Sequence, residues 1–120
     1  MTDTPQHPAT FGNVEALFDS MVPDPEQPAR AAGNPTWMYA SLTEGATDSG
    51  VWSSTVGGWN ETDYPADEVM VLTEGRLRIT ETDGTITELS AGDMFFLPRG
   101  WAGRWDVLED MRKIYVMINR

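Results

Sequence analysis

The sequence predicts an all-β domain preceded by an N-terminal arm. After Pro35, short apolar or alternating segments are separated by turn residues every several positions, which is typical of a β-sandwich or barrel. Residues 1–35 are instead rich in proline and polar side chains. A chain of 120 residues suffices for one domain with one core. We therefore expect an arm over residues 1–35 and a single barrel over residues 36–120.

One short amphipathic helix is predicted within the arm, in the segment NVEALFDSM. Asn13 is a candidate N-cap. Apolar residues follow it at helical spacing, namely Val14, Leu17, Phe18 and Met21. Three prolines then prevent the helix from continuing: Pro23, Pro25 and Pro28. We expect an extended segment that packs along the surface of the barrel.

Eight segments of the barrel have strand character. They are TWMYASL, GVWSSTV, EVMVL, RLRITET, TITEL, MFFL, GRWDV and KIYVMI. In MFFL the apolar residues are consecutive, which predicts a strand covered on both faces.

The clearest local signal is the hairpin RLRITETDGTITEL. Asp83-Gly84 lies between two alternating segments and predicts a two-residue turn with positive φ angles. Alternation places Leu77 and Ile79 on one face of the strand and Arg76 and Arg78 on the other.

Composition excludes several classes of function. The chain carries 19 acidic and 8 basic residues, a formal charge of −11, which repels phosphate backbones and anionic membranes. It has no cysteine, so disulfides, thiolate nucleophiles and cysteine-ligated zinc are excluded. The polar start MTDTPQHPAT is unlike a signal peptide, and no apolar segment approaches the length of a membrane span. We expect a cytoplasmic protein that binds neither nucleic acid nor membranes.

Two motifs give a more specific indication. EVMVLTEG places six residues between Glu68 and Gly75, and GDMFFLPRG has the spacing Gly92, Pro98, Gly100. In this order they resemble the two conserved motifs of the cupin superfamily, and the resemblance covers roughly residues 36–118. It implies a jelly-roll barrel, the double-stranded β-helix. The segments GVW, YPADEVMVLTEG, PRGWAGRW and RKIY resemble more narrowly the small single-domain cupins related to the (S)-ureidoglycine aminohydrolase cupin domain.

Cupins bind a divalent metal through three histidines and the glutamate of the first motif, a set that this sequence lacks. The resemblance aligns two of the histidines with Thr62 and Tyr64 and the third with Gly103. The single histidine of the chain, His7, lies in the N-terminal tail. We therefore predict a barrel without metal or other cofactor.

A carboxylate-ligated metal site is an alternative. With one more residue in the spacer, Glu61 and Asp63 would join Glu68 in an all-oxygen set suited to Mg²⁺ or Ca²⁺. Alternation from Glu68, however, places Tyr64 and Met70 on its face and Asp63 on the other. This pattern favours the metal-free interpretation.

Glu68 and Tyr64 are the candidate catalytic residues. Without a metal, an inward carboxylate must be protonated, paired with a cation or hydrogen-bonded. Glu68 could serve as a general acid or base, and Tyr64 could donate a hydrogen bond to it or to a ligand. In the alternative interpretation, the two side chains only bond to each other or to backbone as a remnant of an ancestral site.

Aromatic residues and one lysine complete the predicted ligand site. Trp59 and Trp101 lie in turn-like segments and are candidates for a pocket rim, whereas packing is the favoured role for Trp52 and Trp105. Met70 shares the face of Glu68. Lys113 lies in an apolar strand, where an inward side chain would pair with Glu68 or with a ligand carboxylate.

These observations lead to one principal hypothesis and two alternatives. The principal hypothesis is a cupin barrel that binds a small polar or carboxylate metabolite without a metal, with or without isomerase or hydrolase activity. The first alternative is a non-catalytic sensing or accessory module, and the second is a carboxylate-ligated metal-dependent hydrolase. The resemblance also implies a homodimer.

Overall fold

The computed structural model describes residues 9–28 and 32–119, so His7 lies outside the described residues. In the arm, helix α1 spans Val14–Asp19 and is followed by the two-residue strands β1 (Val22–Pro23) and β2 (Ala32–Gly33). The predicted cap is confirmed, because the side chain of Asn13 accepts a hydrogen bond from the backbone N–H of Ala16 at 3.0 Å. The arm joins the sheet, as β1 pairs with β3 and β2 pairs with β5.

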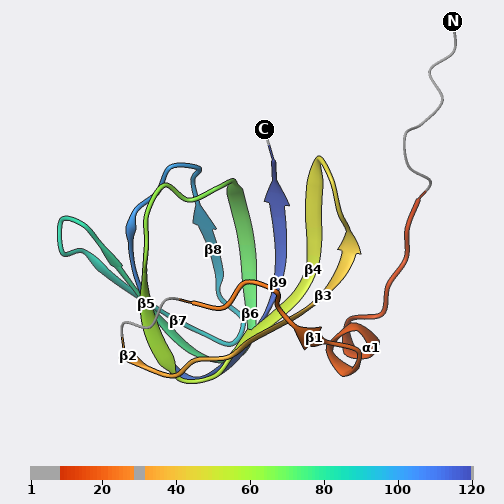
Figure 1. The fold of residues 1–120 in the computed structure, drawn as a ribbon, viewed down its shortest axis with the longest axis horizontal. Coiled ribbons are helices and arrows are strands. Elements are labelled where there is room, and N and C mark those ends of the chain that lie inside the picture. Colours follow the sequence, from red (N-terminus) through yellow and green to blue (C-terminus); the bar gives the residue numbers. More distant parts are fainter. Residues whose placement is uncertain (1–8, 29–31, 120) are drawn as a thin grey trace, which may run out of the picture.

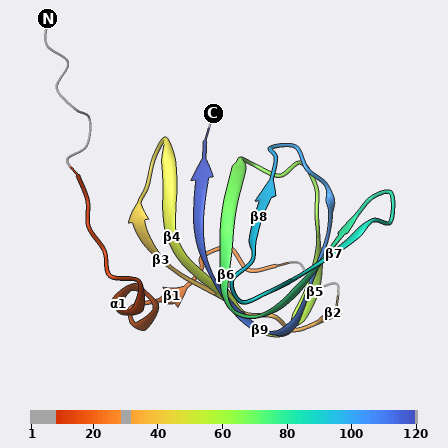
Figure 2. The same ribbon diagram turned by 180° about the vertical axis from the view of Figure 1, so that it is seen from behind.

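The rest of the chain forms an antiparallel barrel-like sheet, as Figures 1 and 2 show from opposite sides. Its strands are β3 (Trp37–Thr43), β4 (Thr47–Ser54), β5 (Gly57–Glu61), β6 (Asp67–Glu81), β7 (Ile86–Ser90), β8 (Met94–Leu97) and β9 (Gly103–Ile118). One side of β9 pairs with β4 and β5, and the other side pairs with β6. The predicted all-β class is confirmed. No helix in the described part of the chain is long and apolar enough to cross a membrane.

Strands β6 and β9 are each longer than predicted. The segments EVMVL and RLRITET form one continuous strand, and GRWDV and KIYVMI form another. Irregular register near Gly75 lets β6 bend while it stays paired with β9. Gly75 has φ +86°, and a Cβ at this position would collide with the backbone carbonyl of Asp110. This close backbone approach explains the motif glycine.

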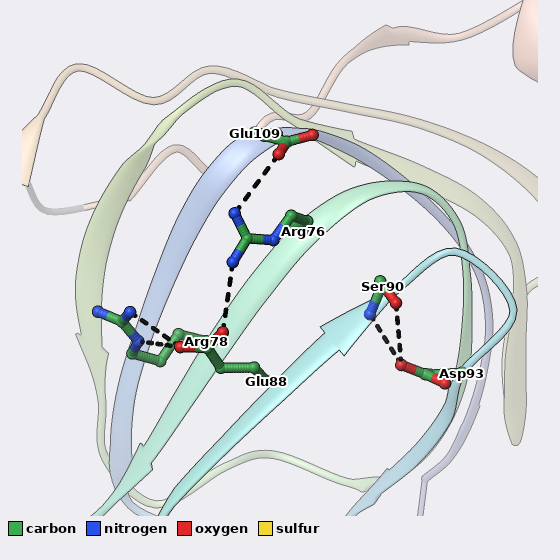
Figure 3. Close-up of polar contacts among 6 residues, drawn as sticks. All are labelled: Arg76, Arg78, Glu88, Ser90, Asp93 and Glu109. Atoms are coloured by element: carbon green, nitrogen blue, oxygen red, sulfur yellow. Dashed lines mark hydrogen bonds and ion pairs between the residues drawn. The ribbon is translucent and has the colours of Figure 1, made fainter.

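The hairpin of β6 and β7 orients its side chains as predicted. Leu77 and Ile79 are buried, whereas Arg76 and Arg78 lie on the outer face and contact Glu88 at 3.3 and 2.9 Å. Figure 3 shows these ion pairs on the outside of the sheet. Because all of these side chains are exposed to solvent, each pair contributes little to stability.

The hairpin turn differs from the prediction. The N–H of Glu81 bonds to the carbonyl of Thr85 at 2.8 Å, which leaves three residues in the loop, and only Gly84 has a positive φ. Asp83 instead accepts a hydrogen bond from the N–H of Thr85 at 2.9 Å. A three-residue loop with glycine in the left-handed region replaces the predicted two-residue turn, because the aspartate stabilises the turn through its side chain.

Two further predictions about strands were wrong. The segment GGWNE, interpreted as a turn, forms β5, because Trp59 lies opposite Trp105 of β9 and packs against it. The MFFL segment is covered on one face only: Met94 and Phe96 are 68% and 53% exposed, whereas Leu97 points inward. The reason is that, within the described chain, no element lies over the outer face of β8.

The barrel interior combines a packed core with a cavity. Leu77, Ile79 and Val107 fill the interior beside the β6–β7 hairpin. The first half of β6 and the second half of β9 contribute to the cavity described below. On the outside, α1 lies against β3 and β4 and buries Phe18, whose ring lies 5.0 Å from the guanidinium carbon of Arg112.

Candidate functional site

The candidate site is a cavity of about 390 Å³ in the barrel. Its walls are aromatic: Trp37, Tyr39, Trp52, Trp59, Trp105 and Tyr115. Carboxylates from separate parts of the chain also line it: Asp24, Glu26, Glu44, Asp48 and Glu61. The volume suits a small organic molecule, and aromatic walls with a few polar groups are typical of ligand pockets.

Glu68 is the most deeply buried carboxylate among the residues that line this cavity. Its side chain is only 1% exposed, and both carboxylate oxygens have partners. The hydroxyl of Tyr64 donates a hydrogen bond to Oε1, and Nζ of Lys113 lies 2.7 Å from Oε2. Lys113 is itself 4% exposed, so this is a buried ion pair. The structure thus brings together three of the residues that the sequence suggested for the site.

Strand register explains why these side chains meet. Lys113 of β9 lies opposite Leu72 of β6, so alternation directs both Lys113 and Glu68 into the barrel. Tyr64 precedes β6 and is held by its backbone: its N–H bonds to the carbonyl of Trp101 at 2.9 Å, and its carbonyl accepts from Gly100 at 2.8 Å. The turn of the second motif therefore fixes the position of Tyr64.

The ammonium group of Lys113 also lies against aromatic rings. Its Nζ is 4.6 Å from the ring centroid of Trp52, 4.8 Å from that of Trp105 and 5.9 Å from that of Tyr115. Aromatic faces attract a cation, so these rings stabilise the buried charge together with Glu68.

Electrostatics keep Tyr64 in its protonated form. Burial is the main cause that raises the pKa of the Tyr64 phenol well above its usual value, and the nearby charge of Glu68 raises this pKa further. The phenol therefore remains a hydrogen-bond donor at neutral pH. Burial likewise raises the pKa of Tyr115 in the cavity wall.

The tryptophans are distributed differently from the prediction. Trp52, Trp59 and Trp105 all line the cavity, but Trp59 and Trp105 are almost completely buried and stack at 5.5 Å between centroids. Trp59 was predicted at the rim. It forms part of the inner wall because β5 continues through it instead of turning away.

Trp101 and Met70 do not line the cavity, contrary to expectation. Trp101 packs edge-on against Tyr64 at 6.4 Å, and its indole N–H donates to Glu81 at 2.8 Å, which directs the ring away from the cavity. Met70 shares the inward face of Glu68 but is buried within the apolar core.

Several residues that line the cavity were not predicted from the sequence. Alternation in TWMYASL places Trp37, Tyr39 and Ser41 on one face, and this signal could have identified them. The carboxylates of the lining offer no such signal, because they come from the arm, the β3–β4 connection, β4 and β5. Only the folded chain brings them together.

The positions expected for metal ligands do not fit a divalent ion. Thr62 is exposed, and a side chain at Gly103 would collide with the ring of Trp101. Asp63 is exposed and does not line the cavity. Among residues 9–28 and 32–119, no group of three or more His, Asp and Glu side chains is placed to hold a metal. The ammonium of Lys113 instead provides the positive charge beside Glu68.

Fold and motifs together define a cupin. The family model for the EutQ-like cupin domain matches residues 42–115, more than half of the chain. This protein therefore belongs to the EutQ-like cupin family. The narrower relation to the (S)-ureidoglycine aminohydrolase cupin domain stays a prediction.

Solved structures give the same fold. The EutQ protein of Clostridium difficile is 22% identical with a TM-score of 0.63, over 71% of this chain and 69% of that one. A protein of unknown function from Pseudomonas syringae pv. tomato is 24% identical with a TM-score of 0.72, over 81% of this chain but only 43% of that one. A DUF861 family protein from Thermotoga maritima is 32% identical with a TM-score of 0.52, over 54% of this chain and 73% of that one. No protein with curated annotation matches this chain significantly.

Proposed function

We propose that this protein binds a small polar metabolite in the barrel cavity, without a metal, and that Glu68 and Tyr64 form the polar centre of the site. The observation that carries the proposal is the buried triad at the cavity, in which Glu68 contacts Tyr64 and Lys113. A buried ion pair is costly to desolvate and is weak support for stability alone. Its location in a cavity with aromatic walls supports a role in ligand recognition.

The same triad is suited to proton transfer. In the catalytic form of the proposal, Glu68 exchanges a proton with the bound molecule in an isomerisation or hydrolysis. Tyr64 remains protonated, because burial and the charge of Glu68 raise its pKa, so its hydroxyl keeps donating to Glu68 and holds that carboxylate in place.

A thermal-shift screen with small neutral, anionic and cationic metabolites, ureides included, tests binding. Compounds that use the site are expected to raise Tm of the wild type and of the surface control Glu88→Gln by a few degrees. They are expected to leave unchanged the Tm of the double variant Glu68→Gln/Lys113→Met, which lacks the charges of the triad. Compounds that stabilise the double variant equally would contradict the proposal. NMR of each hit incubated with the protein then separates turnover from binding.

An exposed apolar surface favours the second candidate function, that of an assembly or accessory module. Four residues on the outer face of β8 and β9 are solvent-exposed: Met94, Phe96, Val116 and Ile118. Phe96 and Val116 both lie opposite Val69 of β6, which makes the surface continuous across three strands. We call it the outer apolar face.

The occupant proposed for the outer apolar face is a second copy of this chain. Its four exposed side chains present roughly 400 Å² of apolar surface, close to the apolar half of a standard interface of about 800 Å² per partner. The arm, through α1, already covers the neighbouring face of β3 and β4, which leaves this part of the sheet open. The dimer is compatible with ligand binding, because the cavity lies on the inner side of the sheet.

A further inference from the structure

We infer that the cavity selects a small organic cation, a protonated amine, over an anion. This inference rests on the proposed binding function and narrows its ligand class. It follows from the charges that line the cavity and from one buried indole N–H.

The lining carries an excess of negative charge. It contains six carboxylates and one ammonium group, and the Lys113–Glu68 ion pair leaves the other five carboxylates without a basic residue in the lining. They come from three segments that are far apart in sequence, so their convergence is a property of the fold. A carboxylate ligand would meet this repulsion, whereas an ammonium ligand would relieve it.

Four of these carboxylates, those of Asp24, Glu44, Asp48 and Glu61, accept hydrogen bonds from neutral donors. Glu61 accepts from the indole N–H of Trp59 at 3.0 Å, and Asp24 accepts from that of Trp52 at 3.3 Å. Asp48 accepts from Asn119 at 2.8 Å. Within residues 9–28 and 32–119, none of the five forms a salt bridge. Each ionised carboxylate retains lone pairs that an ammonium N–H can use.

A separate observation points to a ligand. Trp105 is 2% exposed and lines the cavity, and its indole Nε1 has no hydrogen-bond partner in the described structure. A buried donor without a partner is costly. The partly buried Trp37, also in the lining, shares this feature. Both nitrogens are covered in this structure, so a neutral acceptor atom on the ligand would satisfy such a donor once the indole ring turns toward the cavity.

Glu61 is the carboxylate best placed to recognise the amine. Its side chain is half-buried in the cavity wall, and this burial is the main cause that raises the pKa of Glu61. The hydrogen bond from Trp59 and the charge of Lys113 lower this pKa. The charges of Glu68 and Glu26 raise it. A bound ammonium would favour the ionised form. Affinity for an amine is therefore expected to rise with pH as Glu61 loses its proton, until the amine itself deprotonates.

The test uses tryptophan fluorescence with three four-carbon probes of different charge: butylamine, butanol and butyrate, at equal ionic strength and neutral pH. Four of the tryptophans line the cavity and report on occupancy. We expect butylamine to bind more tightly than butanol, and butyrate to bind least. Glu61→Gln should weaken butylamine binding about tenfold, as expected for one charged hydrogen bond, and should flatten its pH dependence.

Matched controls make the outcomes distinct. Glu88→Gln removes the same charge from the outer surface and should leave butylamine affinity unchanged. Binding of butanol or butyrate in preference to butylamine would overturn the inference but leave the proposed binding function intact. Equal butylamine affinity in the wild type and Glu61→Gln would also overturn it. If no probe of any charge binds the wild type, both the inference and the proposed function fail.

Discussion

Replacing Glu68 with glutamine is expected to lower the free energy of unfolding by about 3 kcal/mol, because the substitution leaves the buried ammonium of Lys113 without its anion. For a domain of this size such a loss corresponds to a fall in Tm of about 10 °C. Little solvation can replace the lost carboxylate, since Lys113 is 4% exposed and its ammonium lies against Trp52 and Trp105. Chemical denaturation at neutral pH measures the difference.

A second substitution separates charge from packing in this experiment. The double variant Glu68→Gln/Lys113→Met removes both charges and places a flexible apolar side chain among the rings, so it should be more stable than Glu68→Gln alone. Glu88→Gln makes the same chemical change on the exposed hairpin and should stay within about 0.5 kcal/mol of the wild type. A similarly small effect for Glu68→Gln would contradict the buried ion pair.

Replacing Phe96 with aspartate is expected to convert a dimer into a monomer. Phe96 lies within the outer apolar face, beside Val69 of β6, and 53% of its surface is exposed in the single chain. A carboxylate there would be buried without a partner in the dimer, a cost of several kcal/mol for each copy. The monomer tolerates it, because the side chain is then solvated. Light scattering coupled to size-exclusion chromatography measures the mass directly.

The matched control is Ile86→Asp. Ile86 is also an exposed apolar strand residue, at 57%, but it lies on the β7 hairpin outside the outer apolar face. This variant should keep the mass of the wild type. A wild type that is monomeric at micromolar concentration, or a Phe96→Asp variant that remains dimeric, would exclude the outer apolar face as the interface.

The fold could be predicted because its signals are local and consistent. The two motifs and the alternating hairpin each describe contiguous residues, and the structure and the family match agree with them. The boundaries of the strands were harder to predict from the sequence. The continuity of β6 depends on how Gly75 passes the backbone of Asp110, a contact between segments distant in sequence. The MFFL segment was wrongly predicted to be covered on both faces, because its apolar pattern does not show whether another element covers the outer face of the strand.

In the candidate site, too, local patterns could be predicted from the sequence, whereas contacts between distant segments could not. The alternation of side chains about Glu68 and within KIYVMI suggested that Tyr64 and Lys113 could contact Glu68, and both do. The sequence predicted Trp101 at the pocket rim, but its indole N–H bonds to Glu81, a contact that depends on the return of the chain after β8. The acidic lining could not be predicted either, since it depends on how the arm, the β3–β4 hairpin and β5 come together in the fold.

We propose that Lys113, and not a metal ion, provides the positive charge beside Glu68. The most direct measurement is elemental analysis of protein purified without an affinity tag, by inductively coupled plasma mass spectrometry. We expect every transition metal, together with magnesium and calcium, to be far below one ion per chain. One equivalent of a divalent metal that remains after dialysis, and is lost in Glu68→Gln, would contradict it.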